Sequence, residues 1–218
     1  MALFDFDGVI VNSEIKKAQV WGKHLQEYGV PNGGAWYKSR IGRLRIVLCR
    51  EAIELFKLPV TPETFEAQHI ERSRASTESE LPPIPSMIDL VKRLAVANTT
   101  LGIASSQHVR VMDRQLQMIG IKDLFSTIVS GEDNGLPGKP DPAIYLLAAK
   151  RLGVPENACV GIEDTEVGVA AVKAAGMACI GFQNPESGNQ DLSQADMVVN
   201  ETVLPGIYAH HITELVRS

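Results

Sequence analysis

The sequence predicts an α/β fold: a doubly wound, mostly parallel sheet with an all-helical domain inserted after its first strand. From about residue 98 onward, short apolar runs alternate with helical patterns, which is typical of parallel βαβ units. Between residues 13 and 80 the apolar spacing is helical and no strand pattern occurs. A short apolar run at residues 2–4 precedes this stretch and is predicted to be the first strand of the sheet. We therefore expect the helices to be inserted between the first strand and the rest of the sheet.

Composition limits the classes of protein that this chain can represent. The 218 residues are 44% apolar and 22% charged, as in a globular protein with one sizeable core or a core and a small extra lobe. The net charge of −5 argues against nucleic acid or an anionic membrane as a partner. No apolar run approaches the roughly 20 residues that span a bilayer, and we see no signal-peptide pattern. Cys49, Cys159 and Cys179 have unrelated spacings, which predicts reduced, buried side chains in a cytoplasmic protein.

The strands and helices of the predicted sheet alternate along the chain. We expect strands at residues 100–104, 126–130, 158–162, 177–182 and 196–200, and helices at 109–120, 142–152 and 165–175. Asp141 is a candidate N-cap, with Pro142 at the first helical position and Gly153 beyond the last one.

The inserted segment is predicted to form three helices. Ser13 is a plausible N-cap for a first helix that stops at Gly29 and has its apolar positions at Ile15, Ala18, Trp21, Leu25 and Tyr28. A second apolar stripe precedes Pro59 and comprises Leu44, Val47, Leu48, Ala52 and Leu55. A third helix starts at residues 61–63, and Trp36 and Tyr37 are expected in a loop. We therefore expect a discontinuous core, residues 1–12 and 81–218, around a helical cap domain, residues 13–80.

Polar residues follow the apolar strands at the points where each strand should end. Parallel sheets bind ligands at the carboxyl ends of their strands, so these residues should converge there. They are Asp5 and Asp7 after the first strand, Ser105 and Ser106 after the second, and Glu163 and Asp164 after a later one, with Lys139 in a loop before a helix. In isolation, Asp5 and Asp7 would fit an ordinary turn, whereas the set as a whole predicts a site.

The chemistry of this set predicts a magnesium ion and a phosphoryl group. Four carboxylates close together repel one another unless a cation lies among them. Hard oxygen ligands in a loop-built site suit Mg²⁺ better than zinc. A nearby lysine and hydroxyl donors then favour a phosphorylated substrate. One aspartate can attack as a nucleophile and the other can move protons, while Gly8 permits the tight turn between them.

Four segments of the chain resemble the motifs of the haloacid dehalogenase-like phosphohydrolases, in the family's order. They are DFDGVIVNSE at residues 5–14, IASS at 103–106, GKPDP at 138–142 and GIEDTEVG at 161–168. The helical insertion stands where this family carries its small helical cap. Taken end to end, the chain is most similar to the β-phosphoglucomutase and phosphatase subgroup.

The resemblance implies roles for individual residues. Asp5 would be the nucleophile and Asp7 the general acid and base, with Ser105 holding phosphoryl oxygens and Lys139 balancing charge. The Mg²⁺ ligands would be Asp5, Asp7 through its backbone carbonyl, Glu163 and Asp164, with Glu163 acting directly or through water. Gly8 and Ser106 would bind the substrate next to these residues. Arg43 and Arg45 fall where the subgroup carries its cap specificity loop, and we expect them to recognise substrate.

The resemblance leaves several reactions open, and the residues favour one. The dehalogenase branch resembles a version without the second aspartate or the metal site, so Asp7 and Asp164 argue against it. A phosphonate-hydrolysing enzyme with a cap lysine remains open because Lys16 and Lys17 lie in the first cap helix. The main alternative is a sugar phosphomutase like β-phosphoglucomutase, which Arg45 favours.

Other positions argue against the mutase. Lys17 stands where the mutases typically have a histidine, and Gln107 and Val109 where they have Ser and Asn. We therefore expect a Mg²⁺-dependent phosphatase that hydrolyses a small phosphorylated metabolite, in the first place a sugar phosphate, as a monomer or weak homodimer. A non-catalytic phospho-ligand-binding protein is a remote alternative.

Overall fold

Six parallel strands form one sheet in the computed structural model, which describes residues 1–41, 45–77, 81–207 and 209–217. The spatial order of the strands is β3-β2-β1-β4-β5-β6. They are β1 (Ala2–Phe4), β2 (Leu101–Ser105), β3 (Phe125–Ser130), β4 (Val160–Glu163), β5 (Ala178–Phe182) and β6 (Met197–Val199). The prediction of a doubly wound parallel sheet is thereby confirmed. Because the order of strands reverses at β1, the carboxyl end of β1 is the switch point at which such sheets bind ligands.

Strand β1 is short, yet it is one of the two central strands of the sheet. All three of its residues pair on both sides, and Phe4 lies level with Ile103 of β2 and Ile162 of β4. The three side chains are completely buried because helices cover both faces of the sheet. This register places the residues that follow β1, β2 and β4 at one edge.

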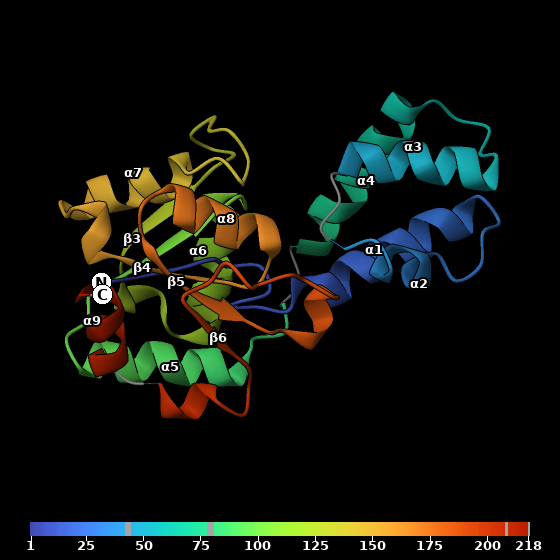
Figure 1. The fold of residues 1–218 in the computed structure, drawn as a ribbon. Coiled ribbons are helices and arrows are strands. Elements are labelled where there is room, and N and C mark those ends of the chain that lie inside the picture. The colour runs from blue at the N-terminus through green and yellow to red at the C-terminus, as the bar shows by residue number, and fades with distance from the viewer. Residues whose placement is uncertain (42–44, 78–80, 208, 218) are drawn as a thin grey trace. The chain divides into compact units, whose positions relative to one another are not determined.

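Helices pack on both faces of this sheet. They are α5 (Pro85–Val96), α6 (Val109–Ile119), α7 (Ala143–Leu152), α8 (Glu166–Ala174) and α9 (Ala209–Arg217), together with the 3₁₀ turns η1 (Lys122–Leu124), η2 (Glu156–Ala158), η3 (Pro185–Ser187) and η4 (Leu204–Gly206). Figure 1 shows α7 and α8 on one side of the strands and α5 on the other. Tyr145 of α7 and Val172 of α8 are fully buried in one cluster with Leu3 of β1.

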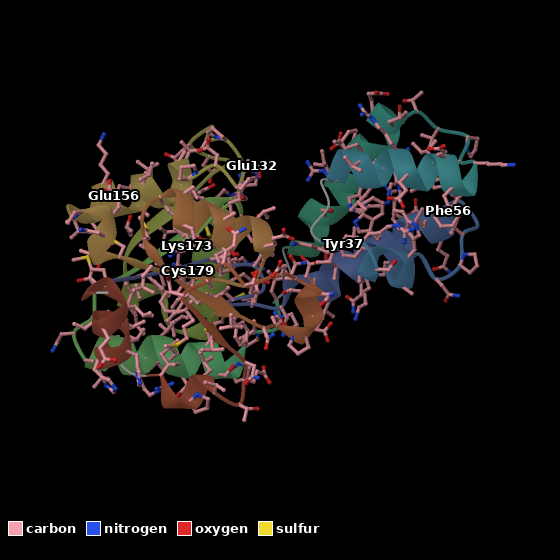
Figure 2. The ribbon with its side chains drawn as sticks, viewed as in Figure 1. Tyr37, Phe56, Glu132, Glu156, Lys173 and Cys179 are labelled. Carbon is pink, nitrogen blue, oxygen red and sulfur yellow. The ribbon has the colours of Figure 1, made fainter. Side chains whose placement is uncertain are left out.

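The chain divides into two compact units, a sheet unit of residues 1–12 and 82–218 and a helical unit of residues 13–81. The helical unit contains α1 (Ser13–Glu27), α2 (Gly33–Lys38), α3 (Arg45–Phe56) and α4 (Pro62–Thr77). Its aromatic core includes Trp21, which stacks on Tyr37 with ring centroids 5.8 Å apart and approaches Phe65 at 6.2 Å. Figure 2 labels Tyr37 and Phe56 in this unit, and Lys173 and Cys179 in the sheet unit. None of the helices within the described ranges is both long and apolar enough to cross a membrane.

Two local predictions for the helical unit are wrong. Trp36 and Tyr37 belong to the short helix α2 rather than to a loop. The paired glycines Gly33 and Gly34 have low helix propensity, which hides this helix from the sequence. They are needed because a Cβ atom at Gly34 would lie 2.7 Å from the carbonyl oxygen of Ala18 in α1.

The predicted stripe of the second inserted helix is also only partly buried. Leu48 and Ala52 of α3 are buried together with Cys49, which the stripe omitted. Val47 and Leu55 are exposed, at 43% and 54% of their surface. Leu44 lies outside the described residues. The stripe failed because the spacing admits two adjacent faces, and tertiary packing chose the one that contains Cys49.

Candidate active site

The turn after β1 places Asp5 at the switch point of the sheet. The backbone N–H of Asp5 still donates to the carbonyl of Ile162 at 3.0 Å, so the residue is anchored to β4. The chain then reverses, with Gly8 N–H donating to Val11 O at 2.7 Å. Gly8 has φ of 80°, and a Cβ atom there would lie 1.9 Å from Oδ2 of Asp164. Only glycine fits this turn, because it combines a left-handed backbone with close approach to a carboxylate.

Lys139 links two carboxylates that come from neighbouring strands. Its Nζ lies 2.7 Å from Oδ1 of Asp5, donates to Oε1 of Glu163 and lies 3.5 Å from Ala104 O. Burial alone would lower the pKa of Lys139, but Asp5 and Glu163 together raise it above its usual range. The ammonium group is therefore charged at neutral pH and faces the predicted nucleophile directly.

Three buried carboxylates gather at this edge of the sheet. Asp5, Glu163 and Asp164 each offer an oxygen within 4.8 Å of the others, and each residue is at most 6% exposed. Burial raises the pKa of Asp5 to about 7, with Lys139 opposing the rise and Glu163 adding to it. Burial, with repulsion from Glu163 and Asp5, also raises the pKa of Asp164 well above its usual range. Keeping all three carboxylates ionised costs free energy through their mutual repulsion unless a further cation joins Lys139.

The oxygen atoms of this cluster fit a divalent cation. Among the described residues, Oδ1 of Asp7 and Oδ1 of Asp164 are buried without a hydrogen-bond partner. Buried polar atoms are normally paired, so the orphaned oxygen of Asp164 within the carboxylate cluster calls for a ligand. Carboxylate oxygens are the donors preferred by hard cations such as Mg²⁺ and Ca²⁺. The grouped carboxylates of Asp5, Glu163 and Asp164 can therefore hold a metal, and the role of Asp7 as a further ligand stays a prediction.

Ser105 and Ser106 stand at the carboxyl end of β2, and Ser106 shares a cavity with Lys139. Ser105 is the last residue of β2 and is 1% exposed, and its Oγ accepts a hydrogen bond from the N–H of Gln107 at 3.3 Å. Ser106 follows it and lines a cavity of about 220 Å³. The remaining lining residues of this cavity are Gly131, Glu132, Leu136, Pro137, Gly138, Lys139 and Ile144. The cavity thus connects a hydroxyl side chain with the buried ammonium group.

Three residues that support the site were missed by reasoning from sequence. Ser187 of η3 donates a hydrogen bond to Oδ2 of Asp164 and is 1% exposed. Asn184, just before η3, donates to the carbonyl of Gly8 at 2.9 Å. Tyr145 of α7 donates to Oε1 of Glu163 at 2.6 Å. None of the three stands in a recognisable motif, and only the fold brings them to the carboxylates.

The predicted substrate arginines belong to the helical unit. Arg45 is the first residue of α3, its side chain is 50% exposed and its Nε lies 3.2 Å from Oε1 of Glu66. Arg43 lies outside the described residues. The role of both arginines in recognition stays a prediction.

Comparison with known proteins agrees with this fold. Residues 2–182 match the haloacid dehalogenase-like hydrolase family. The chain is 30% identical to the β-phosphoglucomutase of Bacillus subtilis, over 92% of this chain and 88% of that one. It is also 30% identical to the phosphorylated carbohydrates phosphatase of Thermotoga maritima, over 80% of this chain and 81% of that one.

A solved structure shows the same architecture. It is a haloacid dehalogenase family hydrolase from Deinococcus radiodurans with bound phosphate and sodium. It superposes with a TM-score of 0.78 at 26% identity, covering 98% of this chain and 95% of that one.

The chain belongs to the haloacid dehalogenase-like hydrolases, as its motifs predicted. Within that class it is a phosphoric monoester hydrolase of the group that contains β-phosphoglucomutases and phosphatases.

Proposed function

We propose that the chain is a Mg²⁺-dependent phosphatase that hydrolyses a small phosphorylated metabolite, in the first place a sugar phosphate. The observation that carries this proposal is Asp5, held at the switch point by Lys139 and flanked by the orphaned oxygens of Asp7 and Asp164. The similarity to a phosphatase of phosphorylated carbohydrates supports the substrate class.

The first step is transfer of the phosphoryl group to the enzyme. A carboxylate oxygen of Asp5 attacks phosphorus, an O–P bond to Asp5 forms, and the bond from phosphorus to the ester oxygen breaks. Asp7 donates a proton to the departing alkoxide, which leaves as an alcohol. Burial raises the pKa of Asp5 to about 7, and Lys139 opposes this rise and so favours the ionised form of the nucleophile.

The second step regenerates the enzyme. Asp7, now a carboxylate, accepts a proton from a water molecule that attacks phosphorus, and the bond to Asp5 breaks to release inorganic phosphate. Ser105 and Ser106 hold the phosphoryl oxygens by hydrogen bonds in both steps. Mg²⁺, held by Asp5, Glu163, Asp164 and the backbone carbonyl of Asp7, would supply positive charge against the phosphoryl oxygens.

Further assignments complete the proposal. We propose that the helical unit acts as a cap that excludes water during the reaction, and that Arg43 and Arg45 help to select the substrate. Three free, buried cysteines support a reducing, cytoplasmic setting. We infer that the protein is a monomer or a weak homodimer, with neither nucleic acid nor a membrane as a partner.

A sugar phosphomutase is the second candidate, favoured by 30% identity to a β-phosphoglucomutase. The test is phosphate release with Mg²⁺ across a panel of phosphorylated metabolites, with β-glucose 1-phosphate followed in parallel for conversion to glucose 6-phosphate. We expect free phosphate from one or a few sugar phosphates and none from Asp5→Asn. Isomerisation without phosphate release would replace the phosphatase by the mutase, and near-normal turnover by Asp5→Asn would overturn the role of Asp5.

A further inference from the structure

The N-terminus of helix α6 lies directly after the serines of the proposed phosphoryl site. Free N–H groups at a helix N-terminus attract anions, so this position could hold a second negative group of a substrate. In this chain the position is taken by a carboxylate of the protein itself. The N–H of Val109, the first residue of α6, donates to Oδ2 of Asp133 at 2.6 Å.

The loop that carries Asp133 is fixed to the end of β2. Gly131 N–H donates to the carbonyl of Ser105 at 2.9 Å, and Asp133 N–H donates to Oγ of Ser130 at 3.0 Å. The amide of Asn134 donates to Ser130 O at 2.7 Å. These bonds hold the acidic pair Glu132 and Asp133 beside the end of β2, where Ser105 and Ser106 lie.

This acidic pair carries net negative charge. His108 lies between the two side chains, with Nε2 3.1 Å from Glu132 and Nδ1 2.8 Å from Asp133. Even a fully protonated imidazole cancels only one of the two carboxylates. The hydrogen bond from Val109, followed by that from His108, lowers the pKa of Asp133, so that carboxylate is ionised at neutral pH.

Glu132 extends this charge to the cavity. It lines the same cavity as Ser106 and Lys139, and its side chain is 57% exposed. Figure 2 labels Glu132 on the loop between β3 and α7. A group that enters the cavity next to the phosphoryl site therefore meets an exposed carboxylate whose ion-pair partner, His108, is shared with Asp133.

We propose that Glu132 and Asp133 are specificity-determining residues that exclude a second anionic group, so that the substrates are phosphate esters of uncharged polyhydroxy alcohols. This inference rests on the proposed phosphatase function and narrows its substrate class. Hydroxyl groups of the alcohol can donate hydrogen bonds to Glu132, whereas a second phosphate or a carboxylate is repelled. At separations of several ångströms near a protein surface, that repulsion is worth on the order of a tenfold loss in kcat/KM.

The test compares fructose 6-phosphate with fructose 1,6-bisphosphate as substrates. We expect wild-type kcat/KM to be about tenfold higher for the monophosphate, and this ratio to narrow in 0.5 M NaCl because salt screens exposed charges. The variant Glu132→Gln/Asp133→Asn should bring the ratio to within about threefold. Asparagine still caps α6, so this variant keeps the helix N-terminus satisfied. Glu156→Gln is the matched control: Glu156 is an exposed glutamate of the sheet unit, labelled in Figure 2 away from Glu132, and its loss should leave the ratio unchanged.

A second measurement requires no turnover. Calorimetry on the Asp5→Asn protein compares binding of the same two esters, with and without the Glu132→Gln/Asp133→Asn change. We expect the bisphosphate to bind more weakly than the monophosphate, and the double change to remove this difference in affinity. That result would support the inference even if the protein were not a phosphatase. A bisphosphate that is bound or hydrolysed as well as the monophosphate by the protein with both acids intact would overturn it. The inference would also be overturned if the double change left the ratio of the two kcat/KM values unchanged.

Discussion

Ser187 donates a hydrogen bond to Oδ2 of Asp164, and among the described residues Oδ1 of the same carboxylate has no partner. One oxygen is thus held by the protein while the other is free to meet a cation. Partners that orient metal ligands commonly change metal affinity by 10- to 100-fold when they are removed.

Ser187→Ala should therefore weaken Mg²⁺ binding by about tenfold, since the carboxylate of Asp164 loses its fixed orientation. Calorimetric titration with Mg²⁺ measures this directly and does not depend on activity. Ser193→Ala, at an exposed serine of the same unit, is the control. Equal Mg²⁺ affinity in the two variants would show that Ser187 only fills space.

Gly8→Ala should destabilise the sheet unit and abolish activity. The residue has φ of 80°, and the added Cβ would overlap Oδ2 of Asp164 and come within 2.9 Å of Oγ of Ser187. The backbone strain and the overlap together should cost at least about 2 kcal/mol in the free energy of unfolding. Urea unfolding followed by far-UV circular dichroism checks this. At Gly206 a Cβ would meet nothing within 4 Å, so Gly206→Ala should unfold at the wild-type midpoint.

Tyr145→Phe removes one of the two donors to Oε1 of Glu163 and leaves Lys139 as the other. We expect kcat to fall about three- to tenfold with KM nearly unchanged, because Lys139 loses its fixed position between Glu163 and Asp5. The lost hydrogen bond should also cost roughly 1–3 kcal/mol of stability. Steady-state kinetics and urea unfolding separate the two effects.

Tyr28→Phe is the comparison for this change. It removes a hydroxyl that donates to Gln68 at 2.8 Å within the helical unit. If both variants lost stability but neither lost kcat, Tyr145 would be only structural.

The helical unit should lose stability in mild acid. Nδ1 of His24 and Nδ1 of His69 lie 3.3 Å apart in its core. Burial, followed by repulsion from His24 and from Arg45, lowers the pKa of His69 to about 3. A histidine with a depressed pKa contributes its stability above its unfolded pKa of 6.5, and this stability is lost as pH falls from 6.5 toward 3. Each pH unit in that window costs at most about 1.4 kcal/mol.

Tryptophan fluorescence during urea unfolding measures this effect, because both tryptophans of the chain, Trp21 and Trp36, lie in the helical unit. We expect the midpoint at pH 5 to be clearly below that at pH 7.5, and His69→Gln to reduce the difference. His210→Gln, at an exposed histidine of the sheet unit, should leave the difference as in wild type. An equal pH dependence in all three proteins would exclude the buried pair as its source.

Predictions from sequence succeeded where the information is local. Alternating apolar runs predicted the parallel strands, because each strand must bury both faces under helices. The residues just after β1, β2 and β4 were predicted to converge, and Asp5, Glu163 and Asp164 do so, since parallel register aligns strand ends. Their catalytic roles stay proposals that the experiments above test.

Predictions failed or were silent where distant segments meet. Residues 33–38, which form helix α2, were expected to be a loop, because paired glycines are typical of turns. The glycines are instead required by the close packing of α2 against α1. The predicted apolar stripe of α3 included the exposed Val47 and Leu55 and omitted the buried Cys49, because spacing alone does not say which neighbour the helix will contact. The bonds of Ser187 to Asp164 and of Tyr145 to Glu163 join residues that are 23 and 18 positions apart.

The sequence by itself determined the α/β architecture, the helical insertion pattern and the family, because periodicity and short motifs are properties of consecutive residues. Only the tertiary structure decided which side chains hold the carboxylates in place, which of their oxygens remain unpaired and which acids border the cavity. Those features depend on how side chains from separate elements pack together, and in a close-packed protein that is settled by the whole core at once.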